Sequence, residues 1–150
     1  MTHTIRDPNY EARVRASFAA QKFMETLGAQ LERVLPGEVV IALPFRGDLT
    51  QQHGYLHAGV TAALADSACG YAALTLMEPD AAVLSVEFKL NLLAPAEGDR
   101  FAAIGRVVRA GRTLTVCSAE VRAIQDRAEV VVAVMQATMI ALRGRTGMRD

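Results

Sequence analysis

The stretch QQHGYLHAGVTAALADSACG, residues 51–70, decides how the rest of the chain is interpreted. It begins with polar residues, continues as a run of Ala, Val, Leu and Gly, and carries one carboxylate, Asp66, inside that run. An unpaired ionised carboxylate costs several kcal/mol in apolar surroundings. Asp66 is therefore expected to be paired, neutral or retained for chemistry.

The apolar run predicts one long helix over residues 58–77, stopped by Pro79, because it is long and has few β-branched residues. The backbone amides of the first turn, at Ala58 and Gly59, are then free to stabilise a carbonyl oxygen that becomes an oxyanion. Asp66 lies eight residues further on, about 12 Å along the axis, so one chain does not bring these groups together. A two-fold axis between antiparallel helices would do so, and it predicts a homodimer with two equivalent sites.

The residues after Pro79 read as strands. In VLSVEFKLNLL, apolar residues alternate with polar ones, which predicts a strand with a single buried face made of Leu84, Val86, Phe88, Leu90 and Leu92. Turn signals at PAEGD, AGR and QDR divide the remainder into three further strands. These strands are predicted at about residues 100–109, 113–124 and 129–142.

The residues before the quoted stretch predict one amphipathic helix over about 9–27, ending near Gly28, and two short strands at 29–35 and 39–45. The fold class is therefore α+β, with a curved antiparallel sheet of about six strands wrapped around one central helix. Length and composition, 150 residues of which 51% are hydrophobic, indicate a single domain with its core at about residues 29–142.

Charge and cysteine usage exclude several classes of function. Lys plus Arg (16) equals Asp plus Glu (16), so no overall field attracts nucleic acid or an anionic membrane. Cys69 and Cys117 lack the spacing of a metal site or a disulfide framework. The amino terminus lacks the apolar segment of a signal peptide, and no apolar run is long enough to span a membrane. A cytoplasmic protein without a metal is expected.

The order of elements resembles the hotdog-fold acyl-CoA thioesterases of the PaaI-like group over about residues 31–142. HGYLHAGVTAALADSACGYAAL opens the central helix and SVEFKLNLLAPAEGD follows on the next strand. The resemblance implies a hotdog fold and a homodimer with one continuous sheet, often paired again into a homotetramer. It also implies hydrolysis of an acyl-CoA thioester at the subunit interface without a metal or organic cofactor.

The resemblance also implies roles for single residues. Asp66 corresponds to the family's general base or nucleophile, and the amide of Ala58, which follows the motif His57, corresponds to the group that polarises the thioester carbonyl. The family usually has His-Gly-Gly where this chain has His57-Ala58-Gly59, so we expect narrower clearance for the acyl group. Ser85 matches a family Ser or Thr that orients the attacking water.

Further contacts follow from the same resemblance and from the chemistry of coenzyme A. Gln51 stands where the family commonly has Asn, and Gln52 is an alternative for that role. Three arginines around the VVRAGRT turn are candidates for the CoA phosphates, because a guanidinium suits phosphate: Arg106, Arg109 and Arg112. Tyr55, Tyr71 and Phe88 are candidates for an aromatic lining of the acyl pocket.

Simpler interpretations stay open beside these. Asp66 could be a structural carboxylate, His57 could only satisfy the first turn of the helix, and Cys69 is expected to be a small core residue rather than a nucleophile. At the level of the whole chain, the alternatives to a thioesterase are a hotdog enoyl-CoA hydratase or dehydratase and a non-catalytic dimer that binds acyl-CoA.

Overall fold

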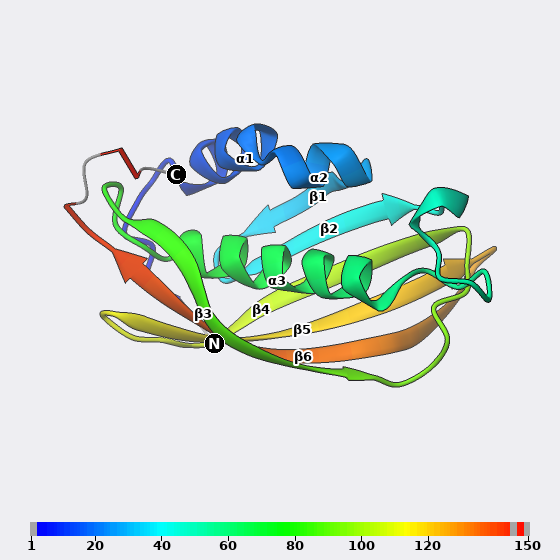
Figure 1. The fold of residues 1–150 in the computed structure, drawn as a ribbon. Helices are drawn as coiled ribbons and strands as arrows, with labels where there is room; N and C mark the ends of the chain where they lie inside the picture. The colour runs from blue at the N-terminus through cyan, green and yellow to red at the C-terminus, as the bar shows by residue number, and fades with distance from the viewer. Residues whose placement is uncertain (1–2, 145–146, 149–150) are drawn as a thin grey trace.

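A six-stranded antiparallel sheet organises the chain, of which the computed structural model describes residues 3–144 and 147–148 (Figure 1). The strands pair in the order β1-β2-β4-β5-β6-β3, and the sheet curves around helix α3, Ala58–Leu74 (Figure 1). The predicted architecture is confirmed, and each predicted strand agrees with the structure to within two residues. The strand bounds are β1 Gln30–Leu35, β2 Glu38–Pro44, β3 Ala82–Leu92, β4 Arg100–Ala110, β5 Leu114–Gln125 and β6 Ala128–Leu142.

Helix α3 lies close to the sheet because both surfaces carry small side chains. Gly105 of β4 faces the helix, and a Cβ atom at this position would lie 2.3 Å from the carbonyl group of Ala68. The backbones therefore meet without side chains between them. The helix ends three residues earlier than predicted, at Leu74. The Thr75 hydroxyl donates to the Ala72 carbonyl and accepts from the Gly37 amide, which joins the helix end to the β1–β2 turn.

The predicted helix over residues 9–27 is two helices, α1 (Tyr10–Ala20) and α2 (Lys22–Leu27), with a break at Gln21, whose backbone is extended. The break turns the chain so that Phe18 of α1 contacts the ring of Tyr71 edge-on, 5.8 Å between centroids, while Met24 and Leu27 of α2 are buried in the same core. Helix α2 ends at Gly28, as predicted, in the left-handed conformation that glycine favours.

Arg13 fastens this N-terminal unit to the end of α3. Its guanidinium donates to the carbonyl oxygens of Leu74 (2.9 Å) and Glu78 (2.7 Å) and pairs with Asp7 at 3.2 Å. A cation at the C-terminus of a helix satisfies carbonyls that lack an intrahelical partner. No helix among the described residues has both the length and the apolar character needed to cross a membrane.

Strand β3 differs from its prediction, because its pairing with β6 shifts register between Ser85 and Glu87. Directly opposite residues of paired strands share a face. Ser85 lies opposite the buried Met139, and Phe88 lies opposite the buried Ala137, so both face α3. Leu84 lies on the other face. The predicted single buried face, with Leu84 and Phe88 together, is therefore wrong.

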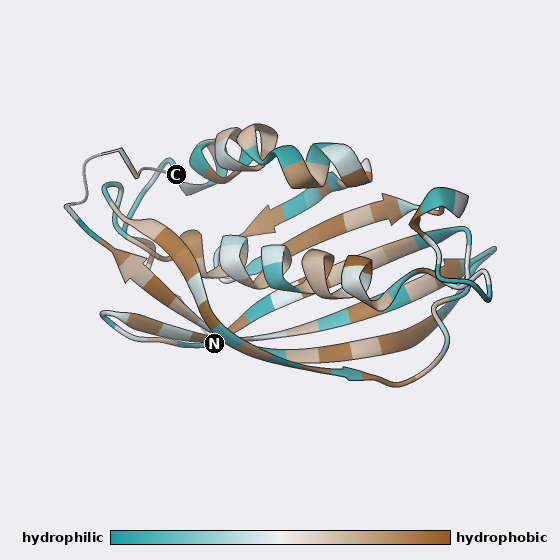
Figure 2. Cartoon of the chain, in the orientation of Figure 1, coloured by the Kyte–Doolittle hydropathy of each residue, from teal (hydrophilic) through white to brown (hydrophobic). Residues whose placement is uncertain are grey.

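β3 also forms one edge of the sheet, and its apolar side chains are only partly covered. Val86, Phe88 and Leu92 are 55%, 48% and 56% exposed. Figure 2 shows apolar segments along this strand. An edge strand with unpaired backbone groups and exposed apolar side chains is a surface suited to pairing with another strand.

Candidate active site

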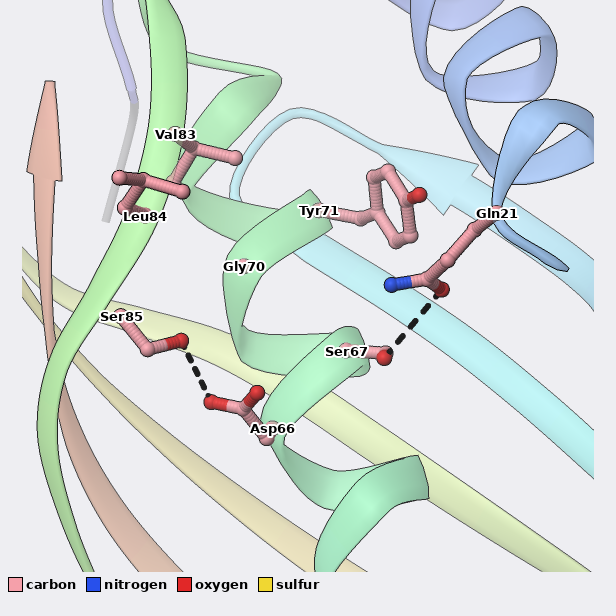
Figure 3. Close-up of a pocket in the computed structure, with 8 residues that line it drawn as sticks. All are labelled: Gln21, Asp66, Ser67, Gly70, Tyr71, Val83, Leu84 and Ser85. Carbon is pink, nitrogen blue, oxygen red and sulfur yellow. Dashed lines mark hydrogen bonds between the residues drawn. The ribbon is translucent and has the colours of Figure 1, made fainter. Parts of the chain in front are cut away.

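A pocket of about 220 Å³ lies beside Asp66, between α3, β3 and the junction of α1 with α2 (Figure 3). We call it the Asp66 pocket. Its residues come from three segments that are far apart in the sequence, and α3 supplies half of them. They are Gln21, Asp66, Ser67, Gly70, Tyr71, Val83, Leu84 and Ser85.

Asp66 is half-buried in the wall of this pocket and is held by Ser85 of β3. The Ser85 hydroxyl donates to Oδ1 of Asp66 at 2.7 Å. The second carboxylate oxygen of Asp66 is turned toward the pocket (Figure 3). Asp66 therefore lies at an accessible pocket and not on the fully buried side of α3. A carboxylate at such a position can act as a base or a nucleophile.

The N-terminus of α3 is capped by its own histidine. Nδ1 of His57 accepts from the amide of Gly59 at 2.8 Å, and the His57 carbonyl accepts from the amides of Val60 and Thr61. The Gly59 amide is therefore not free, contrary to the expectation from sequence, while the Ala58 amide takes part in none of these bonds. Because Nδ1 accepts, a neutral His57 ring carries its proton on Nε2, at an exposed position.

A second pocket, of about 230 Å³, opens at this end of α3, and we call it the Ala58 pocket. Gln51 and Ala58 both line it, and the roles that the resemblance implies for them stay predictions. Gln51 is oriented by its own loop, since its side-chain oxygen accepts from the His53 amide. Gln52 lies outside both pockets, beside the exposed His53 ring. The lining comprises Gln51, Tyr55, Leu56, Ala58, Thr61, Leu92, Ala94, Pro95, Ala96 and Val132.

Within one chain the two pockets remain separate. Asp66 and Ala58 are eight residues apart on α3, which corresponds to about 12 Å along the helix axis. Both pockets border β3, the Asp66 pocket at Ser85 and the Ala58 pocket at Leu92. The chain therefore carries two separate pockets along the same edge strand.

The three arginines proposed for the CoA phosphates line neither of these pockets. Arg106 pairs with Glu38 at 2.8 Å, and the carbonyl of Arg112 accepts from Arg143. Arg109 borders a separate cleft with Arg6 and other residues. Phosphate binding by these residues stays a prediction.

Cys69 is unsuited to act as the nucleophile. Its thiol is buried beside Cys117, and the interaction with that thiol and burial both raise its pKa far above the usual range. A thiol that keeps its proton is a weak nucleophile. This agrees with the expected role of Cys69 as a small core residue.

Four residues of the Asp66 pocket were not singled out from the sequence: Gln21, Ser67, Gly70 and Val83. Gly70 carried a signal, because a glycine inside an alanine-rich helix is uncommon without a reason. Gln21 carried none, since it reaches Ser67 only through the break between α1 and α2, where its side-chain oxygen accepts from the Ser67 hydroxyl at 3.5 Å (Figure 3).

Comparison with known families settles the relationship of the chain. The family model described as the thioesterase superfamily matches residues 53–130, more than half of the chain, and this segment includes α3, Asp66 and Ser85. The chain belongs to the thioesterase superfamily. The predicted family and the predicted enzyme class, a thioester hydrolase, are thereby confirmed.

Known proteins similar to this thioesterase agree with that assignment. A thioesterase family protein from Silicibacter pomeroyi is 55% identical, with a TM-score of 0.89 over 90% of this chain and 99% of that one. The 1,4-dihydroxy-2-naphthoyl-CoA hydrolase of Listeria monocytogenes is 28% identical over 81% of this chain and 96% of its own length. The PaaI protein of E. coli, at 20% identity, shares the hotdog fold with a TM-score of 0.80 over 91% of this chain and 95% of that one.

Proposed function

We propose that this thioesterase hydrolyses an acyl-CoA to the free acid and coenzyme A, at a site completed by two copies of the chain. The observation that carries the proposal is the pair of half-sites on one free edge: Asp66 with Ser85 in one pocket, the Ala58 amide with Gln51 in the other. The CoA hydrolase among the similar proteins supports the choice of a CoA thioester.

A two-fold axis near the middle of β3 would join the half-sites. If two β3 strands pair antiparallel around Phe88, the Ser85 end of one strand lies beside the Leu92 end of the other. The Asp66 pocket of one subunit then meets the Ala58 pocket of its partner, twice per dimer. The exposed Val86, Phe88 and Leu92 support this pairing, because it would remove their side chains from water.

The chemistry follows from the groups at the joined site. As a general base, Asp66 takes a proton from water while the water oxygen bonds to the thioester carbon. The carbonyl oxygen becomes an oxyanion beside the Ala58 amide and the positive end of α3. The carbon–sulfur bond then breaks, and the thiolate takes the proton from Asp66. As a nucleophile, Asp66 instead forms an acyl anhydride, expels the thiolate and is freed by water.

The side chains around Asp66 and Ala58 would hold these two groups in place. The Ser85 hydroxyl occupies one oxygen of Asp66, so the other is presented to the reaction. Gln51 borders the Ala58 pocket and is placed to bind the substrate near its carbonyl. The Nε2 proton of His57 lies at the same helix start and can donate to the substrate.

The test compares Asp66→Asn with Asp48→Asn in an assay of free thiol released from a panel of acyl-CoAs. Asp48 makes an exposed ion pair with Arg46, outside both pockets, so its variant controls for the substitution itself. We expect kcat to fall about 100- to 10,000-fold for Asp66→Asn and to stay unchanged for the control.

Two further measurements, made alongside the thiol assay, have outcomes that would contradict the proposal. Hydration of an enoyl-CoA without release of thiol would indicate a hydratase. An increase in melting temperature with acyl-CoA, again without release of thiol, would indicate a protein that only binds its ligand.

A further inference from the structure

Gly70 forms part of the Asp66 pocket, yet nothing in the helix requires a glycine there. It lies inside α3 and is not among the glycines with a positive φ. A Cβ atom added to it would meet no atom within 4 Å, so no neighbouring group excludes a side chain. A glycine inside a helix destabilises it by about 1 kcal/mol relative to alanine. Because Gly70 lines the Asp66 pocket, the absence of a side chain at this position leaves space in the pocket.

The position of Gly70 relates this space to the reacting group. In Figure 3 the pocket extends from Asp66 and Ser85 along α3 past Gly70. Val83 of β3 and Gln21 stand on opposite sides of Gly70, so the three residues form two walls and a floor (Figure 3). An acyl group whose carbonyl carbon lies near Asp66 would extend over Gly70.

The dimensions indicate which acyl groups fit. A cavity of about 150 Å³ holds a benzene molecule, so a pocket of about 220 Å³ holds a group of ring size with a few additional atoms. The side chain of Gln21 already bounds this volume, and its side-chain oxygen accepts from the Ser67 hydroxyl at 3.5 Å.

We propose that Gly70 and Gln21 are specificity-determining residues that set the size limit of the acyl group, Gly70 as the floor of the acyl pocket and Gln21 as its wall. The inference rests on the proposed function. It assigns short or ring-sized acyl groups, and not long saturated chains, as the substrate class. The α1–α2 unit is thereby part of the substrate site, although it lies outside the segment that the family model matches.

The experiment measures kcat/KM for acetyl-, butyryl-, hexanoyl- and decanoyl-CoA with wild type, Gly70→Ala, Gly70→Val and Gln21→Ala. We expect Gly70→Val to lower the ratio of hexanoyl- to acetyl-CoA at least about tenfold, with Gly70→Ala in between. Gln21→Ala removes a wall and should shift the preference the other way, toward decanoyl-CoA. Gly70→Ala should also raise Tm by about 2–4 °C, because alanine is the better helix former.

Ala16→Val is the control, because it introduces valine at an exposed position of α1 outside the pocket. We expect its ratios of kcat/KM between the acyl-CoAs to equal those of wild type. If wild type hydrolyses the acyl-CoAs and the Gly70 and Gln21 variants leave the ratios unchanged, the size limit is set elsewhere and this inference fails alone. If wild type releases no thiol from any acyl-CoA, the proposed function fails and this inference fails with it.

Discussion

Asp66 is a carboxylate on a helix that is otherwise mostly apolar, and its position and its hydrogen-bond partner explain why it is tolerated there. The side chain is half-buried at a pocket wall, and a hydroxyl from another element occupies one of its oxygens. A hydrogen bond to a charged acceptor contributes about 1.5–3 kcal/mol, which offsets part of the desolvation of the charge. Position and partner together place Asp66 at the pocket with one oxygen held by Ser85.

Ser85→Ala is predicted to lower kcat about tenfold or more with little change in KM. The hydroxyl contacts the carboxylate and orients it, and about 1.4 kcal/mol of lost orientation corresponds to a tenfold loss of rate. Thiol-release kinetics at saturating acyl-CoA measure this effect. Ser85→Thr keeps the hydroxyl and should recover most of the activity, whereas a purely structural role for Ser85 would lower the melting temperature and leave kcat intact.

The sequence selected Asp66, Ala58 and Gln51 from one short stretch, and each of them lines a pocket in the structure. Their roles in a reaction stay predictions. The occupied Gly59 amide could not be predicted, because it depends on the rotamer by which the His57 ring turns back onto the helix. Gln21 was equally hidden, since it reaches Ser67 across 46 positions of the sequence.

At the scale of elements, periodicity and turn residues located α3 and the strands but not two irregularities. The break at Gln21 contains neither proline nor glycine, so it follows from packing of α1 and α2 on the core and not from a local signal. The bulge in β3 is hidden because Val86, at the register shift, is itself apolar and continues the alternating pattern. Both features shape the Asp66 pocket.

Gly105→Ala is predicted to destabilise the protein by about 1–3 kcal/mol, because the new methyl group would overlap the backbone of α3 at Ala68. Urea unfolding followed by circular dichroism measures the change. Gly47→Ala is the matched control, since a Cβ atom there meets nothing within 4 Å and its φ is not positive. Equal stability of the two variants would show that α3 moves away from the sheet easily.

At the scale of the whole molecule, Glu78 ties the two ends of the chain together. It accepts from Arg6, ahead of α1, at 2.8 Å and from Arg143, after β6, at 2.7 Å. Partial burial alone would raise the pKa of Glu78, but the hydrogen bond from Arg143, a backbone hydrogen bond and the nearby positive charges outweigh it and hold the pKa below its ordinary value of 4.5. The folded state therefore favours the ionised carboxylate.

The stability that this group contributes should depend on pH. Because the folded state lowers the pKa, the contribution is fully present above about pH 4.5 and is lost as the pH falls through the folded value. We expect Glu78→Gln to have a lower melting temperature than wild type at pH 7 and the difference to shrink below pH 4.5. A difference in melting temperature that stays constant across this range would contradict the ionic contribution of Glu78.

The proposed assembly predicts complementation between two inactive variants. Ala58→Pro deletes the proposed oxyanion amide with little strain, because proline suits the first position of a helix and His57 before it is already extended. Asp66→Asn removes the acid. Each variant alone should be inactive, but a heterodimer contains one intact site, so an equal mixture refolded together should regain roughly a quarter of wild-type activity.

The reciprocal mixture gives the sharper discrimination, because it places both changes in one chain. Refolding wild type with an equal amount of the double variant Ala58→Pro/Asp66→Asn leaves no intact site in any heterodimer if the site is shared. The mixture should then have roughly a quarter of the activity of an equal total amount of pure wild-type protein. This activity comes from the wild-type homodimers alone. If the site lies within one chain, this mixture should instead keep half of the activity. The mixture of Ala58→Pro with Asp66→Asn should then regain none.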